Sequence, residues 1–427
     1  MVPIDTPHLG LVPQHFTKQQ RHQYLINISL SRPYYNSKLA PNSIMSQVYG
    51  LPSSYYATPM VIGEGAAAFS TYLLFDISTD MTWIQCEGCD PCFQVNNNRN
   101  FDYSHSPNFE MMSVDDPLCY PRFDRRGLCG YSFTYTKSST RGIMATDNFI
   151  FQNSVTGGAE VYNGYAFGCG FENKDFTFGA STGPRNMIAG VQGLLPGRRS
   201  FLNQLEHRIQ GRFSYCLPSQ NNLSPPMSTM YFGEDAYISG DDDTQVNAIA
   251  MDIKTNAYFL YLNGISVDGV RLAIDPSIFE FERIRHTFRG FIIDSGAPYM
   301  TLARSAHDPF RDAIVSYFKE NYRLKPQPTS NTFEVHYKSN NHDIQFPSIV
   351  LHFEGPDHTS EVDMVLNKEN MFTEYNYNGE YGFGLMLLPI DDPGPSLLGA
   401  FQQSNFKFLF DIPNKILYFV PKICREN

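Results

Sequence analysis

Two short stretches, one in each half of the 427-residue chain, share a pattern that strongly constrains the fold. In the first, the apolar run 73–75 leads into Asp76 and a polar turn. In the second, the apolar run 291–293 leads into Asp294 and a turn of small residues. The repetition predicts a protein of two lobes, each of which contributes one aspartate to a central cleft.

The rest of the chain predicts strands much more often than helices. It holds 34 Phe and 26 Tyr, and short apolar runs alternate with Gly and Pro, which is typical of strand-rich proteins. Only a few segments have a helical pattern, among them 200–209 and 305–322. The length allows two or three domains. We expect a separate segment over 1–50, an N-terminal lobe over 51–235 and a C-terminal lobe over 236–427, with the boundary in the polar region 219–245.

Charge and hydropathy exclude some classes of partner. The formal net charge of −11 and the isoelectric point near 5.5 argue against nucleic acid as a ligand. No apolar run is long enough to span a membrane. The N-terminus lacks the pattern of a signal peptide, whereas eight cysteines favour an oxidising compartment. We therefore expect a secreted or vacuolar protein whose true start lies outside this sequence or that reaches its compartment by an unusual route.

The first 50 residues allow two interpretations. Residues 17–30 could form an amphipathic helix rich in Lys, Gln, Arg and His. A basic segment ahead of an acidic body would suit a propeptide that covers an acidic cleft. The alternative is a disordered tail, and composition does not separate the two.

The cysteines gather in one region of the chain. Cys86, Cys89 and Cys92 could be thiolate ligands of a metal, but no second pair or histidine completes such a set. A loop closed by disulfides is favoured, and no metal or cofactor is expected. All eight cysteines are disulfide candidates: Cys86, Cys89, Cys92, Cys119, Cys129, Cys169, Cys216 and Cys424.

A β-hairpin is predicted between residues 129 and 151, where two alternating runs flank a polar stretch. It could be a plain surface hairpin. Alternatively, it could be a mobile flap with Tyr135 near its tip.

Two carboxylates about 3 Å apart cannot both ionise easily, so they share a proton and titrate as a pair. One can take a proton from a bound water while the other donates a proton to a carbonyl oxygen. Such a pair hydrolyses an amide without a metal or a covalent intermediate. The sequence contains no metalloprotease helix motif or phosphate-binding loop that would favour different chemistry.

The sequence resembles the pepsin-like aspartic proteases, especially their plant nepenthesin-type branch, from about residue 52 to residue 424. The motifs occur in order: F-D-x-x-x-D-x-T-W-I-Q-C, F-G-C-G, S-F-L-N-Q-L, Y-L-N-G-I-S-V-D-G, I-I-D-S-G-A-P-Y and S-L-L-G-A-F-Q-Q-S-N. The resemblance implies an all-β, bilobal fold with a few short helices and a central cleft. It also implies a monomeric acid endopeptidase, made as a zymogen, that cleaves protein or peptide substrates.

The resemblance assigns roles by motif position. Asp76 and Asp294 would be the catalytic aspartates, Tyr135 the flap tyrosine and Trp83 its partner. Residues 86–129 would be the cysteine-rich insertion of the branch. The residues that would support the two active-site loops are Thr79, Gly193, Ser295, Gly296 and Gly399.

Several positions depart from the family pattern. The usual Asp-Thr-Gly-Ser motif reads Asp-Ile-Ser-Thr here, so Ile77 lacks a hydroxyl and Ser78 adds a side chain beside the carboxylate. Ala297 replaces a hydroxyl residue, and Gln192 replaces an apolar one. The flap tip 136–139 lacks the usual glycines. These changes leave a second hypothesis open: a catalytically impaired homologue that binds a protein, as inhibitor-like relatives do.

Overall fold

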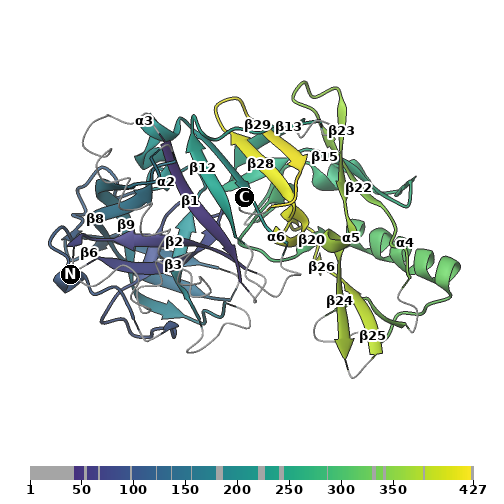
Figure 1. The fold of residues 1–427 in the computed structure, drawn as a ribbon, viewed down its shortest axis with the longest axis horizontal. Coiled ribbons are helices and arrows are strands. Elements are labelled where there is room, and N and C mark those ends of the chain that lie inside the picture. The colour runs from purple at the N-terminus through teal and green to yellow at the C-terminus, as the bar shows by residue number, and fades with distance from the viewer. Residues whose placement is uncertain are drawn as a thin grey trace. The chain divides into compact units, whose positions relative to one another are not determined.

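The computed structural model describes residues 43–51, 55–65, 68–96, 99–121, 123–135, 137–154, 156–178, 186–219, 227–239, 245–285, 287–328, 333–339, 343–377 and 380–424. The chain forms two compact units. Unit 1 runs to Tyr215 and includes Met227–Tyr237, and unit 2 comprises Cys216–Pro226 and Ile238–Cys424. Both units are built mainly of strands (Figure 1), which confirms the predicted all-β class. The predicted helix over 17–30 lies outside the described residues.

Unit 1 contains twelve strands and three short helices among its described residues. In chain order these are β1 (Ser43–Gly50), β2 (Tyr56–Ile62), β3 (Phe69–Asp76), β4 (Trp83–Gln85), η3 (Tyr103–His105), β5 (Glu110–Met111), β6 (Asp124–Arg125), β7 (Leu128–Thr134), β8 (Ser139–Gln152), β9 (Ala159–Lys174), β10 (Ile188–Gly193), α2 (Phe201–Gln204), α3 (Glu206–Ile209), β11 (Arg212–Cys216) and β12 (Met227–Gly233).

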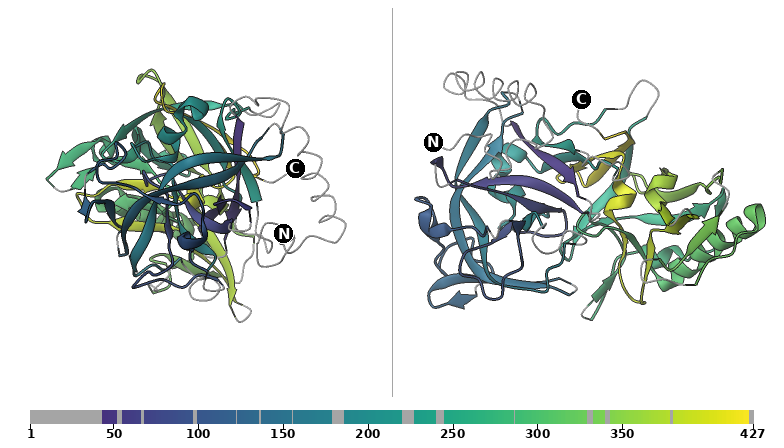
Figure 2. Two further views of the ribbon diagram at one scale, coloured as in Figure 1. Left: turned by 90° about the vertical axis from the view of Figure 1, so that its left-hand side faces the viewer. Right: turned by 60° about the horizontal axis from the view of Figure 1, so that its bottom comes forward.

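The long strands β8 and β9 pair antiparallel over most of their length (Figure 2), with irregularities after Arg141 and Asp147. Strand β3 pairs antiparallel with β2 and parallel with β10. Strand β4 pairs parallel with β9. Large aromatic side chains fill the space between these strands, and Trp83, Phe75 and Phe167 are fully buried. This core fixes the end of β3, where Asp76 lies.

The N-terminal boundary of unit 1 differs from our expectation. The sequence predicts a separate segment over 1–50 and a lobe that begins at residue 51. Instead, β1 pairs antiparallel with β12 from Ser43 to Tyr49 and also contacts β2 (Figure 1). Ile44 and Val48 of β1 are buried, so residues 43–50 are part of the core of unit 1. Alternation over only eight residues next to a polar segment gave a weak sequence signal.

Unit 2 has more separate small sheets. Its elements are β13 (Asn247–Lys254), β14 (Ala257–Leu260), β15 (Leu262–Val267), β16 (Val270–Arg271), η6 (Pro276–Phe279), β17 (Glu282–Ile284), β18 (Thr287–Arg289), β19 (Phe291–Ile293), β20 (Met300–Ala303), α4 (Arg304–Tyr322), β21 (His336–Ser339), β22 (Ile349–Glu354), β23 (Glu361–Leu366), α5 (Lys368–Met371), β24 (Phe372–Tyr377), β25 (Glu380–Leu385), β26 (Leu387–Ile390), β27 (Ser396–Leu398), α6 (Ala400–Gln403), β28 (Phe406–Asp411) and β29 (Ile416–Pro421).

In unit 2, β19 lies between β14, which runs antiparallel to it, and β27, which runs parallel. A four-stranded sheet has the order β16-β15-β22-β23, and a three-stranded sheet has the order β21-β25-β24. Helix α4 buries Phe310, Ile314 and Phe318, which recur every four residues as an amphipathic helix requires. Phe318 contacts Tyr337 of β21 and Phe383 of β25, so α4 packs on the three-stranded sheet.

The predicted helical segments are close to the observed ones. The 305–322 prediction corresponds to α4, and 200–209 corresponds to α2 and α3, which Ser200 begins by accepting a hydrogen bond from the Asn203 amide. The four-residue helices α5 and α6 were not predicted, because one turn is too short to show a helical period. Among the described residues, no helix has both the length and the apolar character needed to cross a membrane.

One buried carboxyl in unit 1 should make stability depend on pH. Asp147 of β8 is fully buried, and its Oδ1 accepts a hydrogen bond from the Asn148 amide at 2.7 Å. Its Oδ2 has no hydrogen-bond partner among the described residues. Burial raises the pKa of Asp147 above its ordinary value, while the Ser106 side chain and the Asn148 amide offset part of this rise and the charge of Glu64 adds slightly to it. The folded protein therefore favours the protonated form of this side chain.

We expect Asp147→Asn to stabilise the protein at pH 7 by on the order of 1 kcal/mol, the cost of one unpaired buried polar atom. The contribution of the Asp147 proton to stability is full below the unfolded pKa and is lost as pH rises through the higher folded pKa. The gain should therefore shrink toward zero near pH 3. Thermal unfolding at both pH values measures the gain in stability. The control is Asp102→Asn, because Asp102 is exposed and its pKa is lowered, mainly by Ser104. An equal gain at both pH values would contradict this account.

Candidate active-site loops

The first predicted half-site is built at the end of β3. Leu73, Leu74 and Phe75 are buried, and Asp76 is 2% exposed. Asp76 is in register with Gly193 of β10, and its carbonyl accepts a hydrogen bond from the Leu194 amide at 2.9 Å. The buried strand therefore fixes the backbone of Asp76 and leaves its carboxylate to the following turn.

That turn directs three hydrogen-bond donors at the Asp76 carboxylate. The amide and the hydroxyl of Ser78 both donate to Oδ1, each at 2.7 Å, and the hydroxyl of Thr79 donates to Oδ2 at 2.7 Å. From the sequence alone, Ser78 is a departure that adds a side chain beside the carboxylate where the family has glycine. The structure instead shows its side chain turned toward Asp76 as an additional donor. Ile77, which lies between Asp76 and Ser78 in the sequence, is fully buried.

Gly193 supports the turn from below. A Cβ atom at this position would lie 2.3 Å from the carbonyl oxygen of Thr79 and 2.8 Å from that of Met81. The Leu195 amide donates to the same Thr79 carbonyl at 3.0 Å. Strand β10 therefore contacts the turn so closely that only glycine fits.

The predicted hairpin is present. Strands β7 and β8 pair antiparallel from Gly130 opposite Ile143 to Thr134 opposite Ser139. At its tip the Tyr135 amide donates to the Ser138 carbonyl at 2.8 Å, while residue 136 of the predicted tip lies outside the described residues. The Trp83 Nε1–H donates to the Tyr135 hydroxyl at 2.9 Å. Burial and the nearby negative charge of Asp76 raise the pKa of Tyr135, so this phenol remains protonated.

An aromatic cluster holds Trp83 and Tyr135 in place. The Phe176 ring lies 5.1 Å from Trp83 and 5.7 Å from Tyr135, and Phe93 lies 6.3 Å from Trp83. Sequence reasoning did not single out Phe176, because a Phe in the irregular stretch after a strand carries no distinctive pattern. The cluster gives Tyr135 an apolar support on one side.

The second predicted half-site repeats this construction in unit 2. Asp294 follows β19, and its amide donates to the Leu398 carbonyl of the parallel strand β27 at 3.1 Å. The Gly296 amide donates to Asp294 Oδ1 at 2.8 Å. Ser295 is fully buried, and Ala297 is half-buried.

Gly399 occupies in unit 2 the place that Gly193 has in unit 1. A Cβ atom there would lie 2.4 Å from the carbonyl carbon of Tyr299. The side-chain amide of Gln403 donates to the carbonyl oxygens of Asp294, at 3.0 Å, and Leu398, at 2.9 Å. Gln403 was not predicted as a support residue, although it lies in the motif that ends the second half of the repeat.

All eight cysteines are joined in disulfides: Cys86–Cys169, Cys89–Cys92, Cys119–Cys129 and Cys216–Cys424. The alternative interpretation of Cys86, Cys89 and Cys92 as thiolate metal ligands is therefore wrong, because a disulfide sulfur carries no thiolate. Cys216–Cys424 joins residues that are 208 positions apart, which local spacing could not reveal.

Each unit thus contains one buried strand that ends at or just before an aspartate, a turn that donates to its carboxylate, and a parallel strand that ends at or just before a tightly packed glycine. This repeated architecture is that of the pepsin-like aspartic proteases. Two family profiles agree with it: residues 56–234 match the one described as "Xylanase inhibitor N-terminal", and residues 257–421 match "Xylanase inhibitor C-terminal".

Curated relatives point to the same family. The chain is 30% identical over 376 residues to Aspartyl protease family protein 2 of Arabidopsis thaliana, covering 85% of this chain and 70% of that protein. It is 27% identical over 390 residues to aspartic proteinase nepenthesin-1 of Nepenthes gracilis, covering 90% and 81% of the two chains. The chain belongs to the plant pepsin-like aspartic protease family, which confirms the resemblance found in the sequence.

Solved structures agree on the fold. The crystal structure of edgp has a TM-score of 0.68 at 15% identity and covers 90% of this chain and 96% of its own. That of Basic 7S globulin from soybean has a TM-score of 0.68 at 16% identity and covers 91% and 99%. At these identities the likeness concerns the fold alone.

Proposed function

We propose that the protein is an aspartic endopeptidase that hydrolyses peptide bonds at acidic pH, with Asp76 and Asp294 as its catalytic pair. The three donors on the Asp76 carboxylate carry this proposal, because they hold a buried carboxylate in one orientation at the end of a rigid strand. The names of the relatives as aspartic proteases support it.

In this proposal the two carboxylates share one proton. The ionised carboxylate removes a proton from a water molecule, the water oxygen attacks the peptide carbonyl, and the protonated carboxyl donates to the carbonyl oxygen. Collapse of the resulting diol then breaks the C–N bond as the leaving nitrogen takes up a proton. Tyr135, supported by Trp83, would cover the bound peptide as the flap.

Substitution of Ser78 for the usual glycine is central to whether the protein is active. Because the Ser78 hydroxyl bonds Asp76, the second half of the Asp-Ile-Ser-Thr motif keeps two side-chain donors on the carboxylate. Only the hydroxyl expected at Ile77 is missing. The motif therefore differs in composition from the usual one but still supplies side-chain hydrogen bonds to the Asp76 carboxylate.

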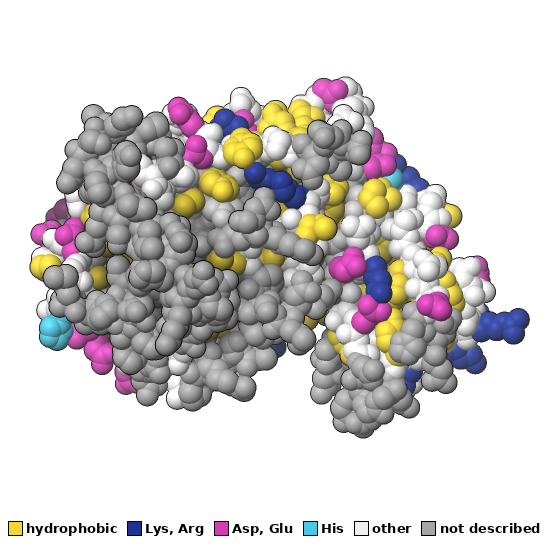
Figure 3. Space-filling model, in the orientation of Figure 1, with side chains coloured by type: hydrophobic (Ala, Val, Ile, Leu, Met, Phe, Trp, Pro, Cys, Tyr) yellow, Lys and Arg dark blue, Asp and Glu magenta, His cyan; other side chains and the backbone are white. Residues whose placement is uncertain are grey.

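The setting of the proposed enzyme follows from other features. Four disulfides suit a secreted or vacuolar protein. The segment before Ser43 would be a zymogen propeptide, and the active form would be a monomer that acts on proteins or peptides. On the face drawn in Figure 3, the described Lys and Arg side chains lie scattered among acidic and hydrophobic ones.

The test is cleavage of a denatured protein by the full chain after acidification, followed between about pH 2.5 and 6, the range in which a proton-sharing dyad works. We expect cleavage that pepstatin blocks and that Asp76→Asn and Asp294→Asn both abolish. Asp80→Asn, four residues from Asp76, serves as the matched control. Absence of pepstatin-sensitive cleavage, or Asp76→Asn acting like the parent, would overturn the proposal.

A finer prediction concerns Ser78. Ser78→Ala should lower kcat roughly tenfold, since one hydrogen bond to a charged group contributes about 1.5–3 kcal/mol, while Ser78→Thr should keep most activity. Ser104 bonds Asp102 Oδ1 through its amide and hydroxyl in the same way on an exposed turn. Ser104→Ala is thus a control that should leave kcat unchanged. Higher activity for Ser78→Ala would show that this serine impairs the site.

A further inference from the structure

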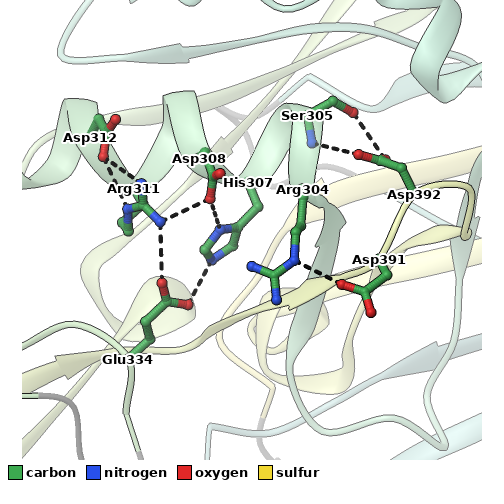
Figure 4. A network of polar contacts seen from close by, with 9 residues as sticks. All are labelled: Arg304, Ser305, His307, Asp308, Arg311, Asp312, Glu334, Asp391 and Asp392. Atoms are coloured by element: carbon green, nitrogen blue, oxygen red, sulfur yellow. Dashed lines mark hydrogen bonds and ion pairs between the residues drawn. The ribbon is translucent and has the colours of Figure 1, made fainter.

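The polar network around the start of α4 in unit 2 is complete in itself. Its carboxylates are those of Asp308, Asp312, Glu334, Asp391 and Asp392 (Figure 4). Each of them accepts a hydrogen bond from Arg304, Ser305 or Arg311. A network whose carboxylates all find donors within their own unit is structural. Unit 1 contains a more reactive group, which is an exposed disulfide.

The Cys89–Cys92 disulfide differs from the other three in its exposure and in its span. Cys92 is exposed and Cys89 is half-buried, whereas no cysteine of the other three pairs is more than 7% exposed. Cys89 and Cys92 are separated by three positions. A cross-link over so short a loop restricts the unfolded chain least, so it adds least to stability. Cys-x-x-Cys is also the spacing with which thiol oxidoreductases open and close a disulfide.

The loop between the two cysteines is held in place by backbone hydrogen bonds as well as by the disulfide. The Asp90 amide donates to the Phe171 carbonyl at 2.8 Å, and the Pro91 carbonyl accepts from the Asn173 amide at 2.8 Å. Both bonds join the loop to β9 and persist when the sulfur–sulfur bond is broken. Opening the disulfide therefore leaves two thiols close together, from which the bond can form again.

The two sulfur atoms have different surroundings. The side-chain amide of Asn100 donates from Nδ2 to Cys89 Sγ at 3.6 Å. Its other end is fixed, because Asn100 Oδ1 accepts from Gln85 Nε2 at 2.8 Å. A donor at Cys89 stabilises negative charge on that sulfur, which makes Cys89 the better leaving group. Attack by an incoming thiolate therefore falls on the exposed sulfur of Cys92.

The surface beside Cys92 is hollowed and admits such a reagent. A cavity of about 400 Å³ is lined by Cys92 and Phe93 of the loop and by Lys174, Asp175 and Phe176 at and beyond the end of β9. The two phenylalanines supply apolar walls. Lys174 offers a positive charge to an approaching thiolate, and Asp175 supplies a carboxylate beside it. The thiol-bearing part of a reductant can therefore reach the Cys92 sulfur from this side.

We propose that Cys89–Cys92 is a thiol–disulfide exchange site that a dithiol opens reversibly. One thiolate of the dithiol attacks Cys92 Sγ, a mixed disulfide forms, and Cys89 Sγ leaves as a thiolate and takes up a proton. The second thiolate of the dithiol then attacks its partner sulfur in the mixed disulfide and releases Cys92. The cysteine pair gains two electrons and two protons, and the dithiol loses them as it becomes a disulfide. The reverse steps close the bond again.

The test is reduction of the folded full chain by a small excess of dithiothreitol at about pH 8, where part of the reagent is thiolate. Samples are trapped with N-ethylmaleimide at successive times, and the labelled cysteines are located by peptide mass mapping. Cys89 and Cys92 should be labelled roughly tenfold faster than the other cysteines, or more, because the exchange rate depends on access to the attacked sulfur. After removal of the reagent, air oxidation of unlabelled protein should restore the pair.

Two variants test the assignment of the sulfur atoms. Cys89→Ser combined with Cys92→Ser should abolish the fast phase and leave the slow labelling of the other cysteines unchanged. Asn100→Ala should slow the opening about threefold, as expected for loss of one weak hydrogen bond to the leaving sulfur. Asn203→Ala, at an exposed asparagine of α2, is the matched control and should react like the parent.

Labelling of all cysteines at one common rate, or no labelling of the folded chain, would overturn the proposal and show that the Cys89–Cys92 bond is a structural cross-link. An unchanged rate in Asn100→Ala would contradict the role of Cys89 as the leaving sulfur. The mapping in the unaltered protein decides the matter even if the double variant fails to fold. None of these measurements requires peptidase activity, so they stand apart from the proposed function.

Discussion

In the proposed peptidase, Gly193→Ala should lower peptide cleavage at least a hundredfold and destabilise unit 1 by about 2–3 kcal/mol, as overpacking a tight contact usually does. The added Cβ would lie 2.3 Å from the Thr79 carbonyl oxygen, which is backbone and cannot rotate away. The turn must move, and with it the Thr79 hydroxyl that holds Asp76. A displacement of about 1 Å at a catalytic group can cost a hundredfold in rate.

The measurement is kcat at acidic pH together with thermal unfolding of the same variant. Gly130→Ala is the matched control, because its Cβ would meet chiefly the Phe123 ring, which is 49% exposed and can swing aside. Gly399→Ala, which would press on the Tyr299 carbonyl carbon at 2.4 Å, should repeat the loss from unit 2. If Gly193→Ala cleaves as fast as the parent, the Asp76 turn does not depend on β10 as described.

Leucine at the neighbouring position 192 should have the opposite effect on stability. Gln192 is fully buried in β10, and neither its Oε1 nor its Nε2 has a hydrogen-bond partner among the described residues. It is in register with Phe75, which is also fully buried. Each unpaired buried polar group costs about 1–3 kcal/mol, so Gln192→Leu should stabilise unit 1 by roughly 1–3 kcal/mol after repacking.

A second buried glutamine of unit 1 gives the control. Gln85 is also fully buried, but its Nε2 donates to Phe93 O and Asn100 Oδ1, and its Oε1 accepts from the Phe93 amide and Asn173. Gln85→Leu should therefore destabilise the protein. Unfolding midpoints in denaturant should rise for the first variant and fall for the second. If both midpoints rise or both fall, burial alone, and not hydrogen bonding, determines the effect of these substitutions on stability.

Much of the fold and of each aspartate turn was predictable, because the signals are local. An apolar run followed by Asp and small polar residues is visible at both Asp76 and Asp294, and alternation predicted the hairpin of β7 and β8. The support glycines were predicted from the family motif. The structure adds the reason at Gly193, where backbone atoms leave no space for a Cβ.

What the sequence did not show depends on side-chain direction and on distant partners. Whether the Ser78 hydroxyl crowds Asp76 or bonds it depends on one rotamer. The link between Gln403 and the Asp294 carbonyl, and the disulfide between Cys216 and Cys424, join positions far apart in sequence. The short strand β1 is defined by its partner β12 and not by its own pattern. Such facts follow from tertiary packing.

The segments of the two units alternate along the chain, which restricts where the protein can be truncated. Unit 1 needs β12, which follows the excursion Cys216–Pro226 into unit 2, because β12 pairs with β1 along seven residues. Unit 2 needs Cys216 from before that strand, because Cys216 closes the disulfide with Cys424. A single cut anywhere in this region would leave either a bare sheet edge or an unpaired thiol. We therefore expect that neither unit can be expressed alone by simple truncation.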